Sequence, residues 1–198
     1  MRQFNLREYK NELRSKTKQY RKTLSAEQKA QMDEAVFANV LRLREYKTCG
    51  SLFTYVSTDI EVDTRKIILK ALEDGKRVAV PRCVHGTRDM VFHYVNSFDD
   101  LESGSFGVLE PKESCETAFS GESDLLLAPA LVIDYDGFRI GYGKGYYDRY
   151  IARFEGKLAG LCYNDNFRKQ IRRGRFDVPV DLVVTDIGIR TVQRKIFK

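Results

Sequence analysis

The chain has 198 residues, of which 42% are hydrophobic and 12% aromatic, and its formal net charge is +6. This composition excludes a disordered chain and suffices for one domain with a substantial core, or for two closely packed lobes. No apolar run approaches the ~20 residues that a membrane helix needs, and the first residues lack the apolar centre of a secretory signal. We therefore expect a cytoplasmic protein with no membrane partner.

The cysteines and the positive charge restrict the function further. The four cysteines are widely spaced and form no C-x-x-C pair, so the sequence predicts neither a metal cluster nor a disulfide framework. The positive charge suits a nucleic acid or a small polyanion such as a nucleotide. Basic residues gather in segments 2–22 and 168–175 without any nucleic-acid-binding signature, and such runs are most often solvated helix faces. We expect no nucleic-acid partner.

Helices predominate in the first part of the chain. Residues 4–20 read as a polar, cationic helix with a sparse apolar stripe. Ser25–Gln28 has the spacing of a capping box, which marks the start of a second helix. A strand rich in β-forming residues is predicted over 49–56. A helix over 64–74 follows, and Gly75 stands where a left-handed residue ends such a helix.

Strands predominate in the second part. They are predicted over residues 78–81, 90–95, 125–133, 157–163 and 182–185. The run 125–133 is the most apolar and is typical of a central strand buried on both faces, whereas the polar segment 99–123 loops over one edge. Apolar residues recur at helical spacing from Tyr147 to Phe154. This alternation predicts an α/β fold, a single domain of three layers (α/β/α) around a mostly parallel sheet.

A glycine-rich segment, 137–149, lies between the central strand and the following helix. It contains four glycines, the cations Arg139 and Lys144, and Asp148. Glycine lets a polyphosphate approach the backbone closely, the cations would neutralise it, and the carboxylate would hold Mg²⁺. Ligands of open α/β sheets collect at strand carboxyl ends near helix N-termini. The segment therefore predicts a magnesium-nucleotide site, with a tight structural turn as the alternative.

Neither of two better-known phosphate loops fits this segment. The Walker pattern needs Ser or Thr after its lysine, but Lys144 is followed by Gly145. The Rossmann pattern needs a glycine where Tyr146 stands. Composition does not choose a second magnesium carboxylate among Asp134, Asp136, Asp177, Asp181 and Asp186.

Several segments together resemble one enzyme family. Gly137–Arg149 resembles the signature of the 5-formyltetrahydrofolate cyclo-ligases, also called methenyltetrahydrofolate synthetases. Segments 10–14, 61–64 and 177–185 resemble other motifs of that family in order and spacing, and 106–111 is a weaker match. The resemblance implies conversion of 5-formyltetrahydrofolate to 5,10-methenyltetrahydrofolate with ATP and Mg²⁺, releasing ADP and phosphate. The reaction would proceed through phosphorylation of the formyl oxygen and attack by N10.

The resemblance also implies roles for individual residues. Lys144, Arg139 and Tyr146 would be catalytic, and Asp148 and Asp177 would hold Mg²⁺. The implied ATP-binding residues are Lys10, Arg14, Arg139, Ile140, Gly141, Tyr142, Gly143, Lys144, Gly145, Tyr146 and Tyr147. The implied folate-binding residues are Val56, Glu61, Tyr142, Gly143, Lys144, Gly145 and Tyr146. A glutamate suits the N–H donors of the pterin, which Glu61 would bind.

Simpler alternatives exist for some of these assignments. Glu61 would face solvent before the next helix, Asp177 would be a turn residue, and Lys10 and Arg14 would be an ordinary exposed pair one helical turn apart. Alternative functions are a kinase or another ATP-dependent ligase acting on a small acid, and an RNA- or nucleotide-binding protein that uses the cationic first helix. We expect a monomer.

Overall fold

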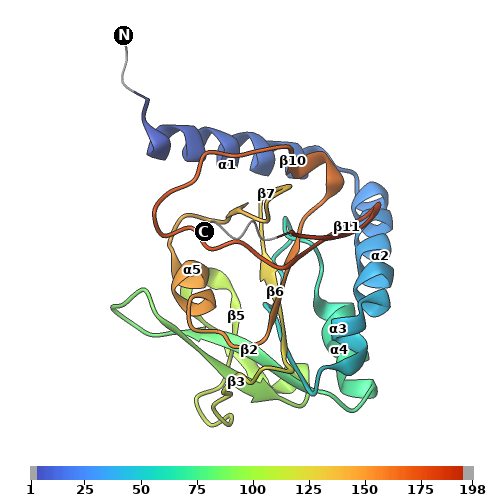
Figure 1. The fold of residues 1–198 in the computed structure, drawn as a ribbon. Helices are drawn as coiled ribbons and strands as arrows, with labels where there is room; N and C mark the ends of the chain where they lie inside the picture. Colours follow the sequence, from blue (N-terminus) through green and yellow to red (C-terminus); the bar gives the residue numbers. More distant parts are fainter. Residues whose placement is uncertain (1–3, 194–198) are drawn as a thin grey trace.

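Parallel strands joined by helices form the centre of the molecule (Figure 1). The computed structural model describes residues 4–193. The strands of the main sheet are β1 (Ser51–Phe53), β2 (Arg77–Cys83), β3 (Met90–Val95), β6 (Leu125–Pro129), β9 (Lys157–Leu161), β11 (Leu182–Thr185) and β12 (Gly188–Thr191). Within the described range their order is β12-β11-β9-β6-β1-β2-β3, and the edge strands β3 and β12 run antiparallel to their neighbours. The predicted α/β class with a mostly parallel sheet is confirmed.

Both faces of the main sheet are covered. The helices are α1 (Leu6–Thr23), α2 (Ala26–Arg42), α3 (Arg44–Thr48), α4 (Arg65–Glu73) and α5 (Tyr146–Ile151). Along β6, Leu125 and Leu127 share a buried cluster with α2, α3 and α4, whereas Leu126 and Ala128 share another with α5. Such alternation, with both faces buried, is typical of a central strand between two layers.

Two smaller sheets complete the architecture. Their strands are β4 (Leu101–Ser103), β5 (Leu109–Pro111), β7 (Val132–Asp134), β8 (Arg139–Ile140) and β10 (Phe167–Arg168). Strands β10, β7 and β8 form a three-stranded sheet in that order, and β4 pairs with β5. Leu13 of α1 packs against a buried cluster that contains Val132 and Ile140 of the three-stranded sheet. This contact places the cationic helix beside the start of the glycine-rich segment.

The apolar run 125–133 is two strands, so its prediction as one was wrong. Strand β6 ends at Pro129, and β7 belongs to the smaller sheet. The carbonyls of Ala130 and Leu131, which lie between the two strands, accept hydrogen bonds from Arg21 at 2.8 and 3.4 Å. Arg21 is itself buried. The chain can leave the sheet here because a distant side chain satisfies carbonyls that would otherwise lack partners.

Most other predictions differ from the structure only at element ends. The capping box at the start of α2 forms in both directions, and Gly75 adopts a φ of 74° after α4. The predicted strand 49–56 is shorter, since only β1 joins the sheet, and segment 99–123 contains the β4–β5 hairpin besides its loops. Helix α3 was not predicted. Between residues 4 and 193 no helix is long and apolar enough to cross a membrane.

Candidate functional site

A cavity of about 460 Å³ opens at the carboxyl ends of three parallel strands. Val56 follows β1, Cys83 ends β2, and Pro129 ends β6, and all three line the cavity. The first helix and the glycine-rich segment form its opposite wall, through residues such as Arg14 and Gly143. This is the position at which open α/β sheets bind ligands.

Every residue predicted for the site lines this one cavity. The set comprises Lys10, Arg14, Val56, Glu61, Arg139, Ile140, Gly141, Tyr142, Gly143, Lys144, Gly145, Tyr146, Tyr147, Asp148 and Asp177. The structure therefore brings together segments from both ends and the middle of the chain. Their individual roles stay predictions.

The glycines of the segment differ in whether the structure requires a glycine at their position. Gly143 has a φ of 91°, and a Cβ there would lie 2.9 Å from Cζ of Arg14. Gly145 has a φ of 82° and precedes α5 as its N-cap. At Gly141 a Cβ would meet no atom within 4 Å. The backbone conformation thus requires glycine at positions 143 and 145, whereas the structure gives no steric reason for glycine at position 141.

Arg14 connects the first helix to this segment. Its Nε donates a hydrogen bond of 2.8 Å to the carbonyl of Gly141, and its guanidinium packs against Gly143. Burial lowers the pKa of Arg14, while the carboxylates of Asp177 and Asp148 act in the opposite direction. Arg14 therefore lies within electrostatic range of both predicted magnesium ligands.

Each predicted magnesium carboxylate is paired with a cation. Asp148 accepts a hydrogen bond of 3.1 Å from Arg139, and Asp177 pairs with Lys10. Asp177 also accepts a hydrogen bond of 2.6 Å from the backbone N–H of Gly174. No group of three His, Cys, Asp or Glu side chains that could hold a metal occurs among the described residues. The two carboxylates fit Mg²⁺ only as partial ligands, as in sites completed by phosphate and water oxygens.

Arg139 is the most deeply buried of the cations that line the cavity. Its side chain is only 3% exposed, yet within residues 4–193 its Nε and one terminal nitrogen have no hydrogen-bond partner. Buried donors without partners cost free energy, and they are expected where a ligand supplies the acceptor. The hydroxyls of Tyr142 and Tyr147 are likewise buried without partners in the described chain. Four buried donor atoms of cavity residues, two on Arg139 and one on each tyrosine, therefore have no acceptor within the described chain.

The tyrosine hydroxyls remain protonated at neutral pH. Burial raises the pKa of Tyr142 and of Tyr147, and the nearby carboxylate of Glu61 acts in the same direction. A protonated phenol donates one hydrogen bond. These two residues can therefore serve acceptor atoms of a ligand.

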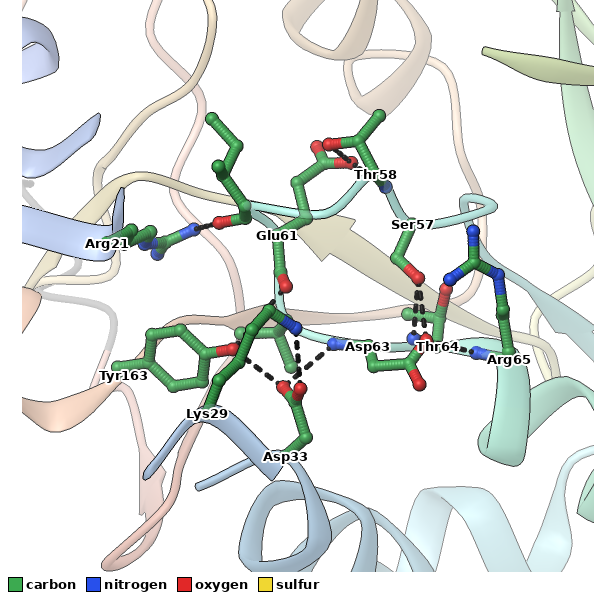
Figure 2. Close-up of polar contacts among 12 residues, drawn as sticks. Arg21, Lys29, Asp33, Ser57, Thr58, Glu61, Asp63, Thr64, Arg65 and Tyr163 are labelled. Atoms are coloured by element: carbon green, nitrogen blue, oxygen red, sulfur yellow. Dashed lines mark hydrogen bonds and ion pairs between the residues drawn. The ribbon is translucent and has the colours of Figure 1, made fainter. Parts of the chain in front are cut away.

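Glu61 is buried and fixed by its own loop. Figure 2 shows its carboxylate directed toward Thr58, whose backbone N–H and hydroxyl both donate to Oε2, at 2.8 and 2.9 Å. Only 8% of Glu61 is exposed. The alternative that Glu61 faces solvent was therefore wrong. A buried carboxylate held in one orientation recognises N–H donors well.

A polar network holds the other side of this loop (Figure 2). Oδ1 of Asp33, on α2, accepts from the hydroxyl of Tyr163 at 2.6 Å and from the backbone N–H of Asp63 at 2.9 Å. Lys29 pairs with Oδ2 of Asp33 at 2.6 Å. Arg21 donates to the carbonyl of Ile60 at 3.1 Å. The backbone around Glu61 is thus anchored to two helices and to the segment that follows β9.

Several cavity residues were not predicted. They are Lys18, Tyr55, Thr58, Pro81, Cys83, Met90, Val108, Leu109, Glu110 and Pro129. The sequence contained an indication for Lys18, since it follows Arg14 by one turn on the same face of the predicted first helix. Asp181 and Asp186, which the sequence left open as metal ligands, accept hydrogen bonds from the backbone of Leu158 and Asn164 and do not line the cavity.

The fold and the cavity define an α/β enzyme with a cation-rich, glycine-lined site at the carboxyl ends of its strands. A family model described as the 5-formyltetrahydrofolate cyclo-ligase family matches residues 6–186. The chain belongs to this family, whose members are ligases.

Individual relatives agree with this assignment. A probable 5-formyltetrahydrofolate cyclo-ligase of Caenorhabditis elegans is 32% identical over 192 residues, covering 90% of this chain and 93% of its own. The 5-formyltetrahydrofolate cyclo-ligase of Haemophilus influenzae is 26% identical, with 88% and 97% covered. Among solved structures, the 5,10-methenyltetrahydrofolate synthetase of Aquifex aeolicus superposes with a TM-score of 0.79 at 28% identity, covering 94% of each chain.

Proposed function

We propose that the protein uses Mg-ATP to convert 5-formyltetrahydrofolate into 5,10-methenyltetrahydrofolate, with release of ADP and phosphate. One observation carries this proposal. Segments that resemble the family's ATP, magnesium and folate motifs lie far apart in the sequence but line one cavity. A reaction between two bound substrates requires such a shared site, because the γ-phosphate must meet the formyl oxygen.

The proposed reaction converts the formyl oxygen, a poor leaving group, into a phosphate ester that leaves readily. The formyl oxygen would take the γ-phosphoryl group of ATP, N10 would attack the formyl carbon, and the C–O bond would break as phosphate leaves with that oxygen. The proton of N10 is lost as the product forms. These steps need alignment and stabilisation of negative charge rather than a covalent nucleophile on the protein.

The cations would exchange their partners when ATP binds. In the proposal Lys10 and Arg139 turn from Asp177 and Asp148 to phosphate oxygens, and the buried donors of Arg139 find their acceptors. Arg14 and the backbone N–H groups of the glycine-rich segment add further donors. The two released carboxylates would hold Mg²⁺ with phosphate and water oxygens, and the ion would neutralise phosphate charge.

Folate would occupy the side of the cavity near Glu61. Its carboxylate, fixed through Oε2 by Thr58, suits the amino and ring N–H donors of a pterin. Val56 would contact the ring, and Tyr146 would lie between the folate and nucleotide sides. A cytoplasmic location, a monomeric state and the absence of a nucleic-acid partner stay predictions.

An absorbance assay tests this function. Purified protein with 5-formyltetrahydrofolate, ATP and magnesium should produce the ultraviolet absorbance of methenyltetrahydrofolate, and omission of any component should abolish it. Lys144→Ala should strongly impair turnover without unfolding the protein, whereas Lys157→Ala, at an exposed lysine that begins β9, should not. ATP hydrolysis that responds to another small acid but not to 5-formyltetrahydrofolate would instead indicate a different kinase or ligase.

A further inference from the structure

Glu110 is a buried carboxylate on the wall of the cavity. It belongs to segment 106–111, the weaker family match, and no role was predicted for it. It lies on β5, is 3% exposed, and its Oε1 has no hydrogen-bond partner among the described residues. An ionised oxygen removed from water without a donor is costly. The arrangement therefore points to a donor supplied by a ligand.

The β4–β5 hairpin holds Glu110 in place. Glu110 pairs with Glu102 in the register of the hairpin, and Arg82 donates to the carbonyl of the next residue, Pro111, at 2.7 Å. A Cβ on Gly104 would lie 2.4 Å from Cδ and Cγ of Glu110. Because residue 104 is a glycine, the side chain of Glu110 can lie directly against its backbone.

The surroundings of Glu110 restrict the kind of donor. The apolar side chains of Pro81, Met90, Val108 and Leu109 line the same cavity as Glu110. Cys83 also lines this cavity. Burial, the charge of Glu110 and a hydrogen bond with that carboxylate raise the pKa of Cys83 to about 11, so it is a neutral thiol, while Oε1 of Glu110 has no partner among the described residues. One fixed acceptor in an apolar wall suits an aromatic ring that carries a single N–H group.

This inference rests on the proposed function, because 5-formyltetrahydrofolate contains such a group. N10 joins the pterin to the p-aminobenzoyl ring and bears one hydrogen and one lone pair. We propose that Oε1 of Glu110 accepts a hydrogen bond from N10–H, and thereby directs the lone pair of N10 toward the formyl carbon. Glu110 is then a specificity-determining residue that recognises the nucleophilic nitrogen, while Glu61 binds the opposite end of the pterin.

A substrate analogue tests the hydrogen bond directly. In the analogue, a CH₂ group replaces N10–H, and its affinity is compared with that of 5-formyltetrahydrofolate by calorimetry. Hydrogen bonds to charged groups discriminate by about tenfold to a hundredfold, so we expect the wild-type protein to bind the analogue weaker by that factor. In Glu110→Leu the two affinities should become equal, through loss of affinity for 5-formyltetrahydrofolate alone.

Three further variants complete the experiment. Glu110→Gln keeps an acceptor oxygen and should retain part of the discrimination. Glu113→Leu removes a neighbouring glutamate whose side chain is 84% exposed, and should leave the affinity ratio unchanged. Gly104→Ala should displace the carboxylate of Glu110 and reduce the ratio, which provides a test that does not depend on the folding of Glu110→Leu.

The outcomes separate this inference from the proposed function. A wild-type protein that binds the two compounds equally, or a folded Glu110→Leu variant that keeps the full ratio, overturns the role of Glu110 while turnover by the wild-type protein stands. A wild-type protein that neither binds nor converts 5-formyltetrahydrofolate overturns both.

Discussion

The hydroxyl of Tyr163 donates a hydrogen bond of 2.6 Å to Oδ1 of Asp33, and this contact lies directly behind the loop that carries Glu61. The same carboxylate oxygen accepts the backbone N–H of Asp63 at 2.9 Å. Tyr163 is fully buried, and the side chain of Asp33 is 14% exposed. A hydrogen bond between Tyr163, which follows β9, and Asp33 of α2 therefore helps to position the loop that carries Glu61.

Tyr163→Phe should weaken both the fold and the folate side of the site. Loss of a hydrogen bond to a charged acceptor costs about 1.5–3 kcal/mol, because Asp33, whose side chain is largely shielded from water, is left with one donor fewer. We expect this loss in the free energy of unfolding in urea. We also expect a higher KM for 5-formyltetrahydrofolate with little change in the KM for ATP. Tyr20→Phe is the control, since it removes a hydroxyl that pairs with the exposed Asp165. Equal increases in both KM values would contradict the specific role in positioning Glu61.

Alanine substitutions in the glycine-rich segment should change the free energy of unfolding by amounts that depend on the backbone conformation of each glycine. A non-glycine residue in the left-handed region costs about 1–2 kcal/mol, so Gly145→Ala, at φ 82°, should be destabilised by that amount. Gly143→Ala combines similar strain with a contact against Arg14 and should lose more. Gly141→Ala has neither cost and should be unchanged or slightly more stable, by about 0.4–1 kcal/mol. Urea unfolding of the ligand-free proteins provides the measurement, and three equal values would refute this explanation.

The reactivity of Cys83 should report the charge of Glu110. Burial is the main cause that raises the pKa of this thiol to about 11, the charge of Glu110 acts in the same direction, and Tyr146 opposes it. The thiolate is the reactive form, so alkylation should be slow near neutral pH and accelerate as the pH rises. Glu110→Gln removes the negative charge, lowers the pKa and should accelerate alkylation at any pH below it. Mass spectrometry of the Cys83 peptide measures the rate. Glu113→Gln should behave as wild type, and identical profiles for Glu110→Gln and wild type would exclude the coupling.

Local signals in the sequence predicted most of the fold and the glycine-rich part of the site. The capping box at Ser25, the helix end at Gly75 and the apolar strands each depend on neighbouring residues, so the pattern contains the information. The same holds for the order of strand, glycine-rich segment and helix around Gly143 and Gly145. Placement of Asp148 in the first turn of α5 followed from that order and is confirmed.

Features that depend on distant partners could not be predicted in this way. The break after Pro129 is stabilised by Arg21, and the anchoring of Glu61 depends on Asp33 and Tyr163. Nothing in the segments themselves indicates these pairings. Glu110 lies in the weaker family match 106–111 but received no role, because its strand has only three residues and only the tertiary structure brings it to the cavity.

Arg139→Met should separate stability from ligand binding. The substitution removes a buried charge whose Nε and one terminal nitrogen lack partners, while Asp148 keeps a side-chain exposure of 32% and stays hydrated. We therefore expect the ligand-free variant to unfold at the same or a higher temperature than wild type.

Mg-ATP should stabilise the wild-type protein but not the Arg139→Met variant. A ligand at a hundred times its Kd stabilises a protein by about 2.7 kcal/mol, or about 5–11 °C in Tm for a chain of this size. We expect this increase for wild type and none for Arg139→Met, as measured by thermal unfolding with and without the nucleotide. Arg149→Met, at an arginine of α5 whose side chain is 58% exposed, should keep the full increase. A fall of several degrees in the ligand-free Arg139→Met variant would instead mean that Arg139 stabilises the fold, and that its unpartnered nitrogens are not held ready for phosphate.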